Sequence, residues 1–360
     1  MAALHYFNAI TPKLYCDPEN GLAACTICGA PFNRPEQQTP AQRWTSRAIL
    51  TSDETLDFTQ TSLDEVSPSL LSRDRAITRL PATVLAHTYF KVTDGDRKGQ
   101  VVAANQSDGY FHAELYLPMH EACLDLVDRF IEAGYTAPPP MAGRWTMSKV
   151  WDVVRLRLEV EEGDENRYGG IEGVEQVSEP HNYYLREHGG PAFQWYDRDS
   201  LNDPSTILGY TSALLQHSRV PPGSGLPPND AVKRLRQEFE RLPQELQDRI
   251  IDQTKPLSGT ARTCNRALGP FVWRRMLSDA SLVPFLWDID TSVLMQGPEL
   301  DYELLVRQLA QPDVFDVGQP LQDVPLGLRN RRRIWRVLES MRAGDRARDS
   351  TLSIFQQDED

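Results

Sequence analysis

The sequence predicts an α+β protein, mostly α-helical, with two structured parts separated by a linker rich in proline and glycine. In the first part, short stretches of alternating apolar residues occur beside two pairs of cysteine and histidine residues. In the second part, apolar residues recur every three to four positions, the period of helices with one buried face. The run from Pro221 to Pro228 interrupts any regular element between them.

Composition is that of an ordinary globular protein, and 360 residues suffice for two or three domains. The net charge of −13 argues against nucleic-acid binding, because phosphates would be repelled. The first residues lack the features of a signal peptide, and no stretch approaches the roughly 18 apolar residues of a membrane span. Five cysteines, an odd number, favour a reducing compartment over a disulfide framework. We therefore expect a cytoplasmic or nuclear protein that does not bind membranes.

Breaks in the apolar pattern divide the chain. Pro138–Pro140 ends the first region, and a helix from Met147 to Glu159 follows it, with apolar residues every four positions. After the linker, Asn229 or Asp230 can cap the next helix. The predicted regions are 1–137, a small α+β domain; 138–228, a helix and an extended linker; 229–290, a helical region; 291–345, C-terminal helices; and 346–360, a flexible acidic tail.

The first region contains two pairs of residues suited to bind a metal. Cys25 and Cys28, followed by Gly29, have the form of a zinc knuckle, in which the glycine permits a tight turn. His120 and Cys123 are three residues apart at the start of a predicted helix, so both side chains project to one side. These four residues match a structural Cys3His zinc site that would staple the ends of the region together.

Other interpretations of the first region remain open. The cysteines can instead be free thiols beside a surface histidine, and Cys16 can replace one ligand or be a buried thiol.

Predicted strands at Val84–Val92 and Tyr110–Leu117 lie between the two pairs of cysteine and histidine residues.

His112 and Glu114 copy the His-x-Glu motif of zinc-dependent deaminases. In those enzymes the Cys-x2-Cys pair follows His-x-Glu, whereas here it precedes it, which argues against catalysis. His181 and His188 lie in a polar, turn-rich stretch and are expected to be solvated.

The stretch Arg241–Gln253 predicts an amphipathic helix with Pro243 at its first position, where the missing N–H costs least. A second helix is expected from Ser258 or Thr260 to Leu268. A third begins at Gly269-Pro270 and carries Phe271, Trp273, Met276 and Leu277.

Further helices are predicted at Asp301–Leu309 and Asn330–Met341. The basic cluster of the latter is expected to form one charged helix face, although nuclear import or an acidic partner would also suit it. The cluster comprises Arg329, Arg331, Arg332, Arg333 and Arg336.

The Leu-Pro-x-Glu-Leu opening, followed by paired isoleucines, resembles the first helix of an F-box, and the resemblance covers roughly 240–287. Together with the Cys-x2-Cys and His-x2-Cys pairs, the motif order resembles F-box-like proteins of filamentous fungi. The resemblance implies an F-box-like helical domain that binds a Skp-type adaptor and, through it, a cullin-based ubiquitin ligase. The residues implied in this binding are Leu242, Pro243, Leu246, Ile250 and Ile251.

The chain would then be a non-catalytic substrate receptor for a target protein that the sequence does not identify. The alternatives are a zinc-stabilised interaction module without a ligase role and a deaminase-like zinc hydrolase.

Overall fold

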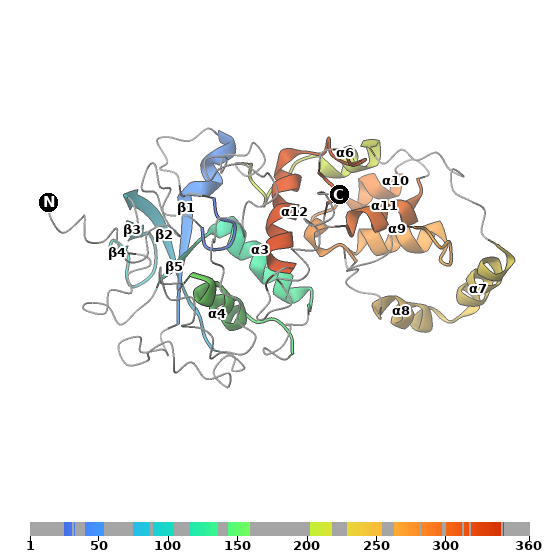
Figure 1. Ribbon diagram of the computed structural model, residues 1–360, viewed down its shortest axis with the longest axis horizontal. Helices are drawn as coiled ribbons and strands as arrows, with labels where there is room; N and C mark the ends of the chain where they lie inside the picture. Colours follow the sequence, from blue (N-terminus) through green and yellow to red (C-terminus); the bar gives the residue numbers. More distant parts are fainter. Residues whose placement is uncertain are drawn as a thin grey trace, which may run out of the picture. The chain divides into compact units, whose positions relative to one another are not determined.

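The computed structural model forms two compact units (Figure 1). The sheet unit comprises Met1–Ser205 and Arg333–Asp360, and the helical unit comprises Thr206–Arg332. The structure describes residues 25–30, 32, 40–53, 75–86, 89–103, 116–135, 143–158, 202–217, 229–253, 263–280, 282–296, 300–311, 313–316, 318–339 and 341.

The sheet unit is built around an antiparallel sheet with the strand order β4-β3-β2-β1-β5. β1 lies between β2 and β5, so that Leu50 faces Leu80 on one side and Pro118 on the other. Every residue of β1 after Arg47 is buried. The strands are β1 (Arg47–Ser52), β2 (Thr78–Ala86), β3 (Tyr89–Val92), β4 (Val101–Ala103) and β5 (Leu117–His120).

The strand predicted over Val84–Val92 is a hairpin in the structure. β2 ends at Ala86, and β3 returns antiparallel to it from Tyr89, with a register shift between Val84 and Ala86. Apolar alternation continues through the reversal, so it does not reveal where one strand ends. Of the strand predicted at Tyr110–Leu117, only the last two residues are described, and β5 begins at Leu117.

Two helices cover the sheet beside β1 and β5. α3 (Glu121–Glu132) follows β5 without a loop and packs on β1, β5 and α4 through side chains that include Leu124, Val127 and Phe130. α4 (Met147–Leu158) agrees with its predicted bounds to one residue, and Val150 and Val154 are buried. The Trp151 indole donates to the Thr51 carbonyl of β1 at 3.4 Å, which ties α4 to the sheet.

The helical unit begins with α6 and ends within α12. α9 and α11 pack together, with the Arg307 guanidinium 5.3 Å from the centre of the Trp273 ring. The helices are α6 (Tyr210–His217), α7 (Asp230–Arg241), α8 (Gln244–Asp252), α9 (Pro270–Ser278), α10 (Thr291–Gln296), α11 (Tyr302–Leu309) and α12 (Leu326–Glu339), with a short 3-10 helix at Pro284–Leu286.

Two helix starts follow the predicted capping signals, and three others differ from prediction by one to four residues. The Asn229 side chain accepts from the Val232 amide at 2.9 Å, and Gly269 caps α9. Pro243, expected at the first helical position, is instead the N-cap of α8, whose first helical residue is Gln244. α11 begins at Tyr302, and α12 begins four residues before the predicted Asn330.

The second helix, predicted from Ser258 or Thr260 to Leu268, is not helical over 263–268, and its earlier residues lie outside the described part of the chain. The Asn265 and Arg266 amides donate to the Glu303 carboxylate at 2.8 and 3.0 Å, and the Asn265 side chain accepts from the Ala267 amide. Arg266 also has a positive φ of 60°. These local bonds replace the bonds that a helix would need.

The expected charged face of α12 is wrong for its central arginines. Arg331 and Arg332 are buried, because Asp288 pairs with Arg331 and aromatic rings cover both guanidinium groups. Among the described residues, no helix is both long and apolar enough to cross a membrane.

Some predictions lie outside the described residues. They concern Cys16, His112, Glu114, His181, His188, the 221–228 linker and the C-terminal tail.

Candidate metal centre

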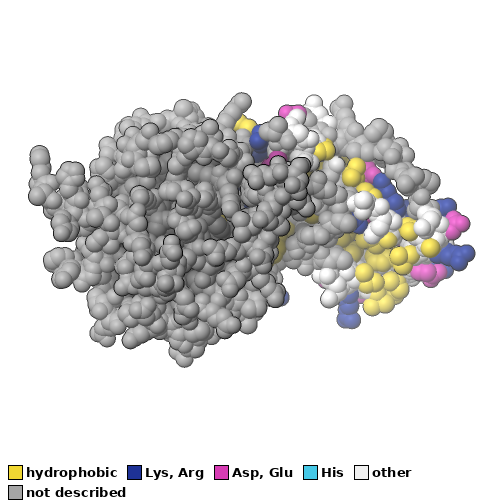
Figure 2. Space-filling view, in the orientation of Figure 1, with side chains coloured by type: hydrophobic (Ala, Val, Ile, Leu, Met, Phe, Trp, Pro, Cys, Tyr) yellow, Lys and Arg dark blue, Asp and Glu magenta, His cyan; other side chains and the backbone are white. Residues whose placement is uncertain are grey.

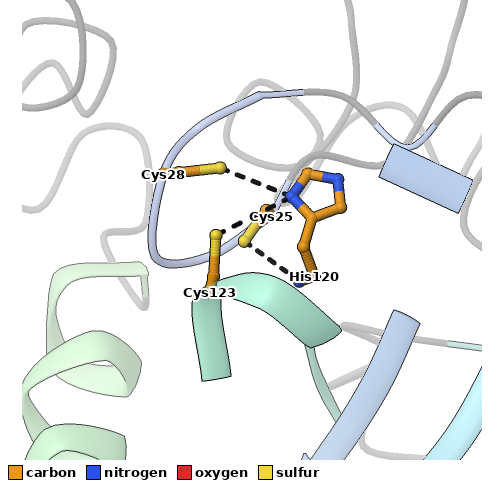
Figure 3. Close-up of side chains that lie close together, drawn as sticks. All are labelled: Cys25, Cys28, His120 and Cys123. Carbon is orange, nitrogen blue, oxygen red and sulfur yellow. Dashed lines mark hydrogen bonds between the residues drawn. The ribbon is translucent and has the colours of Figure 1, made fainter. Parts of the chain in front are cut away.

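The structure brings together the four residues that the sequence selected as metal ligands (Figure 3). The ligand atoms of Cys25, Cys28, His120 and Cys123 all lie within 4.8 Å of one another, and all four residues are buried. His120 Nδ1 lies 3.4 Å from Cys28 Sγ and 4.0 Å from Cys123 Sγ. The cluster is compatible with a metal site.

The Cys25–Cys28 pair lies in a tight turn. The Gly29 amide donates to the Cys25 carbonyl at 2.9 Å, and the Cys25 amide donates to the Ala30 carbonyl at 2.9 Å. Gly29 has a φ of 72°, a conformation that glycine adopts without steric cost. The backbone therefore reverses as a zinc knuckle requires.

Strand β5 anchors this turn beside the second pair of ligands. The amide and the hydroxyl of Thr26 both donate to the Pro118 carbonyl, at 2.9 and 3.1 Å. Pro118 is two residues before His120 in the same strand. The His120 amide then donates to Cys25 Sγ at 3.3 Å, which joins the two pairs directly.

His120 and Cys123 are oriented by the junction between β5 and α3. His120 is the last strand residue and the N-cap of α3, but its side chain makes no capping bond to the helix. The imidazole instead points toward the thiols (Figure 3). Cys123 lies in the first turn of α3, so a three-residue spacing brings both side chains to one place.

Two aromatic rings hold the His120 imidazole. The Phe32 ring centre lies 4.2 Å from that of His120, and the Trp44 ring centre lies 4.6 Å from it. Nε2 of His120 is buried, and within the described part of the chain it has no hydrogen-bond partner. Packing therefore fixes the ring and leaves Nδ1 facing the thiols.

The buried groups of the cluster shift one another's pKa values. Burial by itself would lower the pKa of His120, but the charges and hydrogen bonds of Cys25 and Cys28 raise it to about 10. Burial would raise the pKa of Cys28, yet hydrogen bonds with Cys123 and Cys25 and the charge of His120 bring it well below its ordinary value. Burial and the neighbouring thiols raise the pKa of Cys123. A metal ion must therefore displace protons to bind here.

The types of ligand atom indicate which metal ion this cluster suits. Three thiolates and one imidazole are typical ligands of zinc in a closed tetrahedral site. The sequence identified these four donors but not the side chains that support them. Thr26 and Phe32 are close to the knuckle in sequence, whereas Arg333, which donates from Nη1 to the Cys28 carbonyl at 2.9 Å, is far from it.

The residues implied in partner binding are divided between surface and interior. Pro243 is exposed, as are Leu246 and Ile250, with exposed fractions of 43% and 45%. Leu242 is half-buried, and Ile251 is buried.

The chain matches no protein-family model, and no significant similarity was found to curated proteins or to solved structures. The F-box resemblance accordingly rests on the short motifs around residues 241–253. The candidate metal centre rests on the geometry of its four side chains.

Proposed function

We propose that this chain is a non-catalytic substrate receptor of the F-box type, with a structural zinc ion in the sheet unit. Helix α8 would bind a Skp-type adaptor and so connect the chain to a cullin-based ubiquitin ligase. Another surface would then present the target protein.

The zinc part of the proposal is supported by the closed set of ligands. Four buried donors fill the four positions of a tetrahedral zinc ion and leave none for a water molecule. A catalytic zinc ion keeps one position open for water or substrate. The arrangement thus favours a structural ion.

The adaptor part depends on one observation, the concentration of exposed apolar side chains on α7, α8 and α9. Four of the seven large hydrophobic side chains exposed in the described residues lie on these helices: Leu235, Leu246, Ile250 and Phe271. Figure 2 shows hydrophobic side chains gathered over this part of the helical unit. Contiguous exposed apolar surface marks interaction sites.

Helix α8 carries both exposed and buried apolar residues. Leu246 and Ile250 are four residues apart and so lie on one face, while the buried Ile251 faces the unit. Asp248 also forms an ion pair with Arg275 of α9.

The test measures binding of the purified full chain to a purified Skp-type adaptor by calorimetry. Replacing Leu246 and Ile250 together with alanine should weaken binding by about a hundredfold, roughly 2–4 kcal/mol. Leu208→Ala is the matched control, because Leu208 is 90% exposed but lies outside α7–α9. A well-folded wild-type chain that does not bind the adaptor contradicts the proposal.

One observation favours a second candidate, an interaction module without a ligase role. The residues 263–268 are not helical where the F-box pattern requires a second helix. In that case the double variant of Leu246 and Ile250 would lose a different protein partner, while the Skp-type adaptor would bind neither form.

A further inference from the structure

Arg333 connects the C-terminal part of the chain to the candidate metal centre. Its Nη1 donates to the carbonyl oxygen of Cys28 at 2.9 Å, across 305 positions of sequence. Both residues belong to the sheet unit. The bond holds the peptide group between Cys28 and Gly29, where the knuckle reverses.

The rest of this α12 segment packs on the helix that supplies another ligand. Trp335 is fully buried, and its ring centre lies 5.7 Å from that of Phe130 on α3. The Tyr135 hydroxyl, just after α3, donates to Glu339 at 3.4 Å. Since Cys123 lies in the first turn of α3, the α12 segment contacts the knuckle and also the helix of the second pair.

Charge gives Arg333 a second role at this position. A zinc ion with three thiolates and a neutral imidazole carries one net negative charge, and such a charge is costly to bury unless a cation compensates it. A guanidinium stays protonated at every pH that a protein tolerates. Arg333 thus supplies a fixed positive charge beside a knuckle whose thiols must be ionised.

We infer that Arg333 is a positioning residue of the metal site, which binds no metal itself but orients the Cys28 loop and compensates the charge of the bound ion. This inference rests on the proposed zinc site. It makes the metal affinity of an N-terminal motif dependent on a residue close to the other end of the chain.

Zinc affinity of the full-length chain tests the inference, measured by competition with a chromophoric chelator. Arg333→Gln, which removes the charge, should weaken zinc binding by about 10–100-fold, the usual effect of losing an outer-shell partner. Arg333→Lys, which keeps the charge and a donor, should recover most of the affinity. Arg79→Gln is the control, because Arg79 pairs with Asp128 on α3 and should leave the affinity unchanged.

Cobalt substitution and thermal melting at saturating zinc separate positioning from folding. The Arg333→Gln protein should stay folded with zinc, while its Co2+ form loses intensity in the visible bands of a tetrahedral site. If the wild-type chain binds no zinc, the metal site itself fails. The role of Arg333 is overturned if the wild type binds zinc and Arg333→Gln binds it equally well. It is also overturned if Arg333→Lys and Arg333→Gln lose zinc affinity equally.

Discussion

Arg331 shows how a side chain expected in solvent is accommodated in the interior. Its guanidinium is fully buried, donates from Nη2 to Asp288 at 2.9 Å, and lies 3.8 Å from the centre of the Trp287 ring. Nη1 also donates to the Phe285 carbonyl at 3.2 Å. A buried charge is tolerated when it is paired and hydrogen-bonded in this way.

Acid should weaken the helical unit through Asp288. Burial would raise the pKa of this carboxyl, but hydrogen bonds from Arg331 and its positive charge lower it below the ordinary value. A carboxyl with a lowered folded-state pKa contributes stability above its unfolded pKa of about 4 and loses it as the pH falls further. The stability advantage of wild type over Asp288→Asn should therefore be constant near neutral pH and shrink below about pH 4.

Urea unfolding at a series of pH values measures this difference. Asp323→Asn serves as the control, since Asp323 is an exposed carboxylate of the same unit. Asp323→Asn should leave the pH dependence of the unfolding free energy as it is in the wild type. If the unfolding free energies of the wild type and Asp288→Asn keep a constant difference down to about pH 3, the charge of the ion pair contributes nothing to stability.

Cys28→Ser should release the metal. Zinc ligation by thiolates is coupled to folding, so the variant should lose about one zinc ion and several kcal/mol of stability in the sheet unit. Cys264→Ser is a matched control, because this cysteine is half-buried in the helical unit and should leave the zinc content unchanged. Elemental analysis of freshly purified, reduced protein gives the result, and a wild-type chain without zinc would remove the site.

At the scale of elements, α8 separates what periodicity predicts from what packing decides. Spacing indicated that Leu246 and Ile250 share a helix face. It did not indicate whether the unit would cover that face. In the structure these two side chains are exposed, while Ile251, one position further on, is buried.

Two alanine substitutions in α8 should therefore differ strongly in their effect on the free energy of unfolding. Ile251→Ala should cost about 2–5 kcal/mol of unfolding free energy, since it leaves a cavity in a packed interior. Leu246→Ala should change stability by less than about 0.5 kcal/mol. Thermal or urea unfolding of both variants checks this, and an equal loss in the two would mean that Leu246 also serves the interior.

At the scale of the whole molecule, the sheet unit is assembled from distant parts of the chain. Its sheet and α3 and α4 come from residues before 205, and the second half of α12 completes it from Arg333 onward. Trp335 fills the contact between α12 and α3, near Phe130 and Tyr135. The unit should not reach full stability without this C-terminal segment.

Trp335→Ala should destabilise the sheet unit by about 3–5 kcal/mol, the usual cost of removing a buried tryptophan. Trp335→Phe should cost less, because a phenyl ring can keep part of the contact with Phe130. Denaturant unfolding of the full chain with bound zinc measures both. Equal stability of Trp335→Ala and the wild type would show that α12 is not part of the folded sheet unit.

Local spacing by itself determined each half of the candidate metal centre. Cys25 and Cys28 meet in one tight turn, and His120 and Cys123 meet at the start of one helix, because each pair is separated by less than a helical turn. Helix starts at Asn229 and Gly269 were readable for the same reason, since capping depends on the residues next to the cap.

Only the tertiary structure decided which distant segments contact these local motifs. The rings of Phe32 and Trp44 around His120, the bond from Arg333 to Cys28 and the burial of Arg331 all join segments distant in sequence. An irregular segment at Asn265 likewise stands where a helix was predicted, because the Asn265 amide donates to Glu303 of α11. Periodicity reports which residues share a face, but the partner that covers this face is set by packing between elements.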